Sequence, residues 1–141
     1  MKKRTRSREL ALQFLYQVDL LGPEKLQDLT AFLQEQGEGG DAETTRYARV
    51  LVEGTVDAAP ELDAEIQAVA QNWLIERMAV IDRNVLRMAA FELLHCDEIP
   101  PKVAINEGIE LGKRFSTQNS GAFINGILDK IKNRAAAAEG R

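Results

Sequence analysis

The sequence predicts an all-α fold of two packed antiparallel helical bundles, with about seven helices and no sheet. Two observations predict it. Apolar residues recur every three or four positions along nearly the whole chain, which is the spacing of helices that bury one face. No run of β-branched residues alternates with polar residues, as a half-buried strand requires. Since 45% of the 141 residues are hydrophobic and 28% are charged, we expect one globular domain, residues 1–141.

Three helical segments form the expected N-terminal subdomain, residues 1–59. Gly22-Pro23 ends the first segment, and Pro23 also suits the first turn of the second. Asp41 or Thr44 is the expected N-cap of the third segment. The three apolar faces consist of Leu10, Phe14, Val18 and Leu21, then Leu26, Leu29 and Leu33, then Tyr47, Val50 and Leu51.

The expected C-terminal subdomain, residues 60–134, contains the remaining segments, with Asp82 and Ser120 as expected N-caps. Gly108 and Gly112 lie one turn apart on one helix. Because each glycine weakens a helix by up to ~1 kcal/mol relative to alanine, we expect another helix to pack closely there. The apolar faces include Leu62, Ile66, Val69 and Trp73, then Leu86, Ala89, Ala90 and Leu93, then Ile105, Ile109 and Phe115, then Phe123, Ile124, Ile127, Leu128 and Ile131.

Two stretches have no apolar face. The glycine-rich residues 37–40 are expected to form an exposed, mobile loop, since glycine is costly to hold in a helix. The alanine-rich tail, residues 135–141, is expected to fray.

Charge is distributed unevenly along the chain. Residues 1–8 hold five Lys or Arg residues and no acid, so the formal net charge of −4 becomes −9 when this basic arm is left out. The arm suits a polyanion, and the acidic body suits a basic partner. The alternative to a partner-binding face is that the acidic body is an ordinary solvated surface.

The pattern of the arm favours RNA. Arg4, Arg6 and Arg8 alternate with small polar residues and lead into a helix that carries Gln13 and Tyr16. Arginine forks match phosphate oxygens, while Tyr and Gln side chains stack on or hydrogen-bond to unpaired bases. A reader of duplex DNA would need an internal basic helix, and we find none in the sequence. Two alternatives stay open: a solubilising tail, and a half-buried Tyr16 with a hydrated hydroxyl.

Catalysis, metal binding and cofactor binding are not expected. Neighbouring residues on a helix point about 100° apart, so His95 and Cys96 cannot form a thiolate–imidazole pair. One Cys and one His cannot supply a metal cluster of the usual spacing, and a single Cys excludes an internal disulfide. No apolar run has the length of a secretory or membrane-spanning segment, so we expect a cytoplasmic protein that does not enter membranes.

Several long motifs resemble those of the NusB transcription antitermination proteins, in the same order and across essentially the whole chain. The similar runs are Arg8-Glu9 with ALQFLY at residues 11–16, IDRNVLRMAAFEL at 81–93, Ile99-Pro100, KVAINEGIEL at 102–111 and FINGILDK at 123–130. The resemblance implies two helical bundles and a non-catalytic factor. Such a factor binds the boxA element of nascent ribosomal RNA transcripts together with NusE, a small-subunit ribosomal protein, in an antitermination complex of RNA polymerase.

The resemblance also implies site residues. The expected RNA-binding residues are Lys2, Lys3, Arg4, Arg6, Arg8, Gln13, Tyr16, Asn119 and Phe123. The expected NusE face contains Glu76 and Asp82. Asn119 stands where an acid is common in the family, so it should repel phosphate less. The alternative to this function is a protein–protein scaffold or homodimer whose basic arm is only a solubilising tail.

Overall fold

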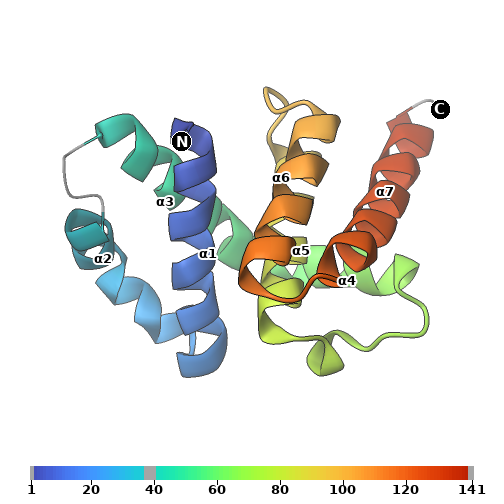
Figure 1. Cartoon of the computed structure of the whole chain (residues 1–141), viewed down its shortest axis with the longest axis horizontal. Helices are drawn as coiled ribbons and strands as arrows, with labels where there is room; N and C mark the ends of the chain where they lie inside the picture. Colours follow the sequence, from blue (N-terminus) through green and yellow to red (C-terminus); the bar gives the residue numbers. More distant parts are fainter. Residues whose placement is uncertain (1, 37–40, 140–141) are drawn as a thin grey trace. The chain divides into compact units, whose positions relative to one another are not determined.

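The computed structural model describes residues 2–36 and 41–139, and in those ranges all regular structure is helical (Figure 1). The predicted all-α fold is therefore confirmed. The elements are α1 (Lys3–Leu21), η1 (Pro23–Asp28), α2 (Leu29–Gln36), α3 (Ala42–Asp57), α4 (Ala59–Val69), η2 (Ile75–Arg77), α5 (Val80–His95), α6 (Pro101–Phe115) and α7 (Ser120–Glu139), where η marks a 3₁₀ helix. The loop predicted at residues 37–40 lies outside the described residues.

The chain divides into two compact units. Unit 1 is Met1–Asp57 and unit 2 is Ala58–Arg141. None of the described helices has the length and apolar character to cross a membrane.

In unit 1, α1 packs mainly against α3, and α2 contacts both helices. Phe14 of α1 and Phe32 of α2 meet with their ring centroids 5.1 Å apart. The α3 face that α1 covers includes Tyr47 and Leu51, whereas Val50 is 43% exposed. The prediction that Val50 belongs to the core was wrong, because it lies about 120° around the helix from the centre of the buried face.

The helix predicted to start at Pro23 is divided into two elements. Gly22 closes α1 by donating its N–H to the carbonyl of Val18, and its φ of 107° is accessible mainly to glycine. A 3₁₀ helix follows, and α2 begins only at Leu29. Leu29 and Leu33 are buried as predicted.

In unit 2, α6 packs against α5 and α7, and α4 contacts the same two helices. A Cβ added at Gly108 would lie 3.2 Å from Leu128 Cδ1 and 3.4 Å from Ala89 Cβ. A Cβ at Gly112 would overlap Ile124 Cδ1. The close packing predicted at the two glycines is therefore confirmed.

The apolar face predicted to run through Trp73 ends earlier. The last residue of α4 is Val69, and Trp73 is 55% exposed. The amide of Gln67 holds this loop by donating to the carbonyls of Ala70 and Trp73 and by accepting from Ile75 N. These bonds replace the helical ladder, so Trp73 leaves the core face.

Among the helix caps, Asp41 was predicted correctly, because its Oδ1 accepts a hydrogen bond from Glu43 N at 3.1 Å. The N-cap of α5 is Ala79, so Asp82 lies inside the first turn, where a carboxylate still complements the helix dipole. Ser120 is likewise the first residue of α7, and its hydroxyl accepts from Thr117 N. The prediction was wrong for both Asp82 and Ser120.

The alanine-rich tail continues α7 as a helix to Glu139, beyond the point from which fraying was predicted. Alanine has the highest intrinsic helix propensity, so residues 135–138 extend the helix without an apolar face.

Candidate nucleic-acid interface

The basic arm is the start of α1. The helix begins at Lys3, with Lys2 in the N-cap position and without a side-chain cap. Its first turn contains no acid, so several cations lie at the positive end of the helix dipole. Cations are unfavourable there, and the turn therefore depends on contacts with other parts of unit 1.

Ser7 provides one of these contacts. It is 1% exposed, and its hydroxyl donates to the carbonyl of Thr44 at 2.7 Å, with the carbonyl of Lys3 3.0 Å away. The bond joins the second turn of α1 to the first turn of α3. The two helices thus begin at the same end of unit 1.

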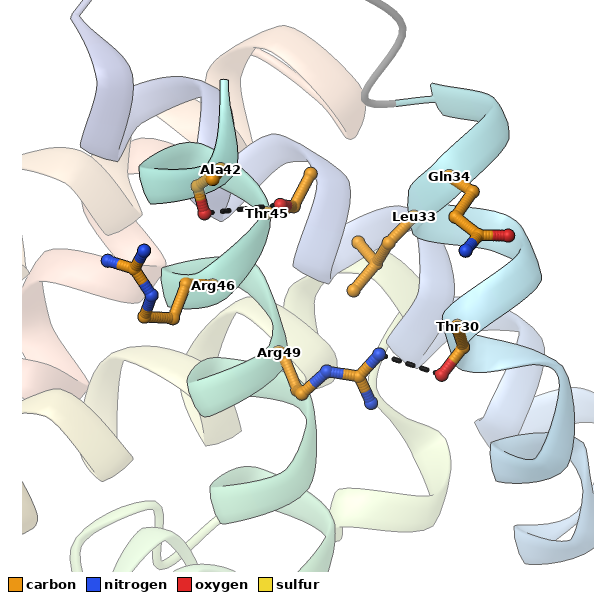
Figure 2. Close-up of a pocket in the computed structure, with 7 residues that line it drawn as sticks. All are labelled: Thr30, Leu33, Gln34, Ala42, Thr45, Arg46 and Arg49. Carbon is orange, nitrogen blue, oxygen red and sulfur yellow. Dashed lines mark hydrogen bonds between the residues drawn. The ribbon is translucent and has the colours of Figure 1, made fainter. Parts of the chain in front are cut away.

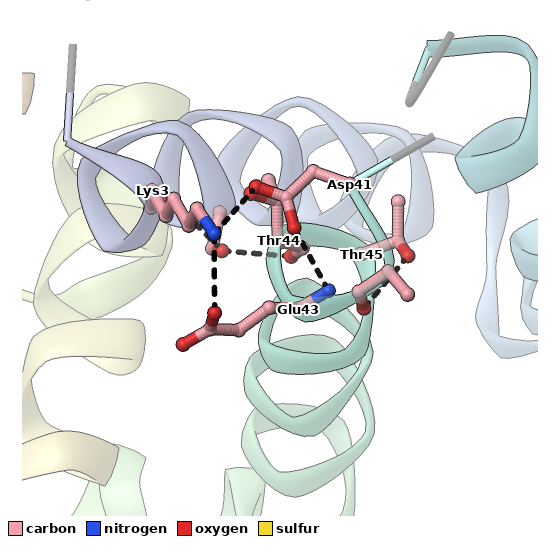
Figure 3. Close-up of polar contacts among 7 residues, drawn as sticks. Lys3, Asp41, Glu43, Thr44 and Thr45 are labelled. Carbon is pink, nitrogen blue, oxygen red and sulfur yellow. Dashed lines mark hydrogen bonds and ion pairs between the residues drawn. The ribbon is translucent and has the colours of Figure 1, made fainter. Parts of the chain in front are cut away.

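Lys3 makes the second contact with α3. Its Nζ lies 3.3 Å from Glu43 Oε2 and 3.4 Å from Asp41 Oδ2 (Figure 3). Hydrogen bonds to Glu43 and then Asp41 raise the pKa of Lys3 above its ordinary value. Desolvation raises the pKa of Asp41, but hydrogen bonds from Thr44 and Lys3 outweigh it, so the net shift is downward.

Tyr47 of α3 provides the third contact. The guanidinium carbon of Arg4 lies 3.9 Å from the centroid of the Tyr47 ring, and that of Arg8 lies 5.9 Å from it. Both separations are within the range of cation–π attraction. Arg8 is only 3% exposed. Its burial against Tyr47 favours a structural role for Arg8, and the predicted contact between Arg8 and RNA stays a prediction.

Helical phase explains why the arm divides into two sets of cations. At 100° per residue, Arg4 and Arg8 fall on the side of α1 that faces α3. Lys2, Arg6, Gln13 and Tyr16 fall within about 80° of one another on a different side. We call these four residues the α1 exposed face.

The α1 exposed face is open at its two ends and partly covered at Glu9, which falls on the same side of the helix and is 3% exposed. Lys2, Gln13 and Tyr16 are exposed, and Arg6 is half-buried. Arg6 Nη1 lies 3.3 Å from Oε1 of Glu9, whose side chain is almost fully buried. The face extends about 21 Å from Lys2 to Tyr16 at 1.5 Å per residue. It joins cations at a helix N-terminus to an amide and an aromatic ring, which suits an anionic strand with accessible bases.

Asn119 and Phe123 belong to unit 2. Asn119 is exposed immediately before α7, and Phe123 is half-buried in its first turns. The Phe123 ring meets Trp73 edge-on, with centroids 5.6 Å apart and planes at 74°. The predicted site residues therefore gather in two places, one in each unit.

The two predicted partner-binding acids lie on either side of the loop between η2 and α5. Glu76 is exposed, whereas Asp82 is half-buried. Arg83 Nη1 donates to the carbonyls of Glu76 and Met78, which holds η2 to the start of α5. Asp82 Oδ1 is enclosed and has no hydrogen-bond partner among the described residues. Glu76 is thus the more accessible of the two.

A pocket of about 550 Å³ lies between α2 and α3 (Figure 2). Arg49 crosses it, with Nη2 2.8 Å from Thr30 Oγ1 and Nη1 3.3 Å from Glu53 Oε2. Arg46 extends away from α2 (Figure 2). The Arg49 side chain thus joins α3 to α2 across the pocket, and its guanidinium is already bonded within unit 1.

His95 and Cys96 take separate positions at the end of α5. His95 Nε2 lies 2.9 Å from Glu61 Oε1, and Cys96 is buried. Neither position brings the thiol and the imidazole together as a nucleophile and base.

Ser7 and Tyr47 are the residues that sequence reasoning missed as parts of this site. A signal for Ser7 was present, because it continues the apolar stripe of Phe14 and Ala11 one turn towards the N-terminus. Tyr47 was assigned only to an apolar face. The identity of the helix it meets depends on tertiary packing.

Comparisons with known proteins agree with this architecture. The family model described as the NusB family matches residues 5–133. The transcription antitermination protein NusB of Anaeromyxobacter dehalogenans strain 2CP-1 is 47% identical over 129 residues, which are 92% of this chain and 89% of that protein.

Solved structures show the same fold. A structure of T. maritima NusB has a TM-score of 0.81 and 37% identity, covering 92% of this chain and 90% of that one. A crystal structure of the antitermination factors NusB and NusE in complex with dsRNA has a TM-score of 0.84 and 26% identity, covering 95% of this chain and 98% of that one. With a family match over most of its length and relatives of this identity, the chain belongs to the NusB family of transcription antitermination proteins.

Proposed function

We propose that this protein is a non-catalytic RNA-binding antitermination factor, which holds the single-stranded boxA element of nascent ribosomal RNA together with a NusE-type protein. The observation that carries the proposal is the α1 exposed face. It aligns Lys2 and Arg6 with Gln13 and Tyr16 on one side of a helix whose N-terminus is positive.

Phosphate binding comes from the first two turns of α1. Lys2, Lys3, Arg4 and Arg6 are at least partly accessible, whereas Arg8 is buried. If these four cations neutralise single-strand phosphates, the logarithm of affinity falls with the logarithm of salt concentration with a slope of about 2.8. Binding is therefore strongest at low salt.

Base contacts come from side chains further along α1 and at the start of α7. The 38% exposed ring of Tyr16 offers a stacking surface, and the Gln13 amide offers both a donor and an acceptor. Asn119 and Phe123 offer the same two kinds of contact in unit 2. Stacking requires unpaired bases, which favours a single strand over a duplex.

The partner surface is proposed around Glu76 and Asp82. An exposed acid beside a half-buried one suits a basic protein such as a ribosomal protein. The proposal is supported by the related NusB that was crystallised with NusE and dsRNA. Through this partner the protein would join the antitermination complex of RNA polymerase.

The double substitution Lys2→Gln and Arg6→Gln tests the function. Removing two of the four accessible cations should weaken binding of a short boxA-type single strand about tenfold or more at low salt. The matched control is Lys132→Gln with Lys25→Gln, which removes two cations that are paired with Asp129 and Asp28. Equal affinities for all three proteins would make the arm a solubilising tail and contradict the proposal.

A further inference from the structure

The middle of α7 and the loop before η2 carry three features that the packing of unit 2 does not explain. They are an exposed tryptophan, a glycine whose added Cβ would meet no neighbour, and a lysine that has no partner among the described residues. We infer that Trp73, Gly126 and Lys130 form a second RNA contact, which stacks one unpaired base and neutralises the adjoining phosphate. The inference rests on the proposed function and extends it to residues outside the predicted site.

Trp73 is exposed and yet fixed. Its carbonyl accepts from Gln67 Nε2 at 2.7 Å, and its backbone N donates to the carbonyl of Ala70 at 3.0 Å. The Phe123 ring lies edge-to-face with the indole, and Trp73 is still 55% exposed, so part of the indole surface is open to a stacking ring. An exposed aromatic side chain held this way loses little conformational freedom when a base stacks on it.

Gly126 lies in the middle of α7, where glycine destabilises a helix relative to alanine. Packing explains the other interior glycines of unit 2. A Cβ at Gly108, Gly112 or Gly121 would lie within 3.4 Å of a neighbouring side chain. A Cβ at Gly126 would meet nothing within 4 Å. The bare helix surface at Gly126 instead permits close approach by a ligand.

Lys130 supplies the charge. It is exposed, and among the described residues no hydrogen bond or ion pair engages its ammonium group. Its neighbours in α7 are occupied, since Lys132 pairs with Asp129 and Arg134 with Glu65. Lys130 is seven residues from Phe123, so both lie on nearly the same side of α7, about 10 Å apart along its axis.

These features together favour RNA over a protein partner. A fixed aromatic face beside a cation is the combination by which proteins hold single-stranded nucleic acid. Glycine between them leaves room for a backbone that passes close to the helix. An apolar protein surface would gain nothing from Lys130.

The test measures binding of a short boxA-type single strand, and of the same sequence as a full duplex, to the whole chain. Trp73→Ala should weaken single-strand binding about 5- to 100-fold, and Trp73→Phe should restore most of it. Lys130→Gln should lower the salt slope by about 0.7. Val103→Ala, at another exposed apolar residue, is the control and should bind normally.

The variant Gly126→Ala distinguishes two roles for the glycine, which are close approach of a ligand and packing within unit 2. It should melt at the same temperature as the wild type or higher, and it should bind the single strand less tightly. A lower melting temperature with unchanged binding would make Gly126 a packing residue and contradict this step.

Three outcomes would overturn the inference. The first is wild-type affinity in Trp73→Ala while Lys2→Gln with Arg6→Gln loses affinity, which leaves the proposed function intact. The second is an equal loss for single strand and duplex in Trp73→Ala. The third is a Trp73→Ala variant that loses binding of a NusE-type protein and keeps its RNA affinity. This result would make the surface a protein contact. If the wild-type protein itself binds no RNA, the proposed function fails first.

Discussion

The guanidinium carbon of Arg4 lies 3.9 Å from the ring centroid of Tyr47, which is only 6% exposed. This pair joins the first turn of α1 to α3 and makes the basic arm part of the folded unit. Cations at the positive end of a helix would otherwise favour fraying. The anchored turn therefore presents its remaining cations in a fixed register.

Replacing Tyr47 tests the anchor. Tyr47→Leu removes the ring that faces Arg4 and Arg8, and we expect residues 3–8 to exchange their amide hydrogens faster. RNA affinity should fall about two- to fivefold, since a cation–π contact of this kind contributes about 0.5–1 kcal/mol. Hydrogen exchange and RNA titration measure the two effects. Tyr47→Phe keeps the ring and should match the wild type; equal exchange in Tyr47→Leu would show that the ring does not anchor the turn.

The acids around Lys3 should restrain RNA binding. Asp41→Asn with Glu43→Gln removes two negative charges beside the arm, and Asn still caps α3. We expect the double variant to bind single-stranded RNA about two- to fivefold more tightly at low salt, with the gain fading as salt screens the charges. Fluorescence titration at two salt concentrations measures it. A decrease in affinity would show that Lys3 must be held by these acids to function.

The same contact has a defined pH dependence. Because the pKa of Asp41 is lowered on folding, its contribution to stability is present above the ordinary value of 3.8 and disappears as pH falls through the lowered value. Because the pKa of Lys3 is raised, its contribution is present below 10.5 and disappears as pH rises through the raised value. The stability difference between wild type and Asp41→Asn should therefore vanish in acid below this range. A stability difference that persisted in acid would have to arise from a group other than the Asp41 carboxylate.

Two glycines in unit 2 should respond to alanine in opposite ways. Gly112→Ala drives a Cβ into the buried Ile124, so we expect a net loss on the order of 1 kcal/mol in the free energy of unfolding. Gly126→Ala meets nothing and should gain about 0.5–1 kcal/mol from helix propensity. Urea unfolding measures both values. If both substitutions changed the free energy of unfolding by a similar amount in the same direction, packing at Gly112 would not determine the effect of Gly112→Ala.

Asn119→Asp should weaken RNA binding. Asn119 is exposed beside the first turn of α7, and a carboxylate there would repel phosphate. One added charge at about 4 Å in water changes the binding free energy by ~1 kcal/mol, or about fivefold. Titration at matched salt measures it, with Asn119→Ser as the neutral control. Equal affinities for the Asp and Ser variants would place the RNA away from this residue.

Local signals account for what the sequence predicted correctly. The Gly22-Pro23 stop and the close packing at Gly108 and Gly112 follow from backbone chemistry that neighbouring residues decide. Helical periodicity likewise predicted the all-α fold, because each helix buries one face.

The remaining features depend on tertiary contacts. Cations at the start of α1 oppose a helix there, and contacts with α3, including Ser7 with Thr44, stabilise the turn that begins at Lys3. The burial of Arg8 depends on the same contact. Trp73 was placed in the core because its spacing fits a stripe, and the hydrogen bonds of Gln67 that end α4 early have no local sequence signature.

The salt dependence of RNA binding tests the central claim most directly. The wild type should bind boxA-type single-stranded RNA with a log–log salt slope of about 2.8, and Lys2→Gln with Arg6→Gln should halve it to about 1.4, since each cation contributes about 0.7. Circular dichroism should confirm that both proteins are equally helical. Identical slopes for the two proteins would contradict the assignment of phosphate binding to the α1 exposed face.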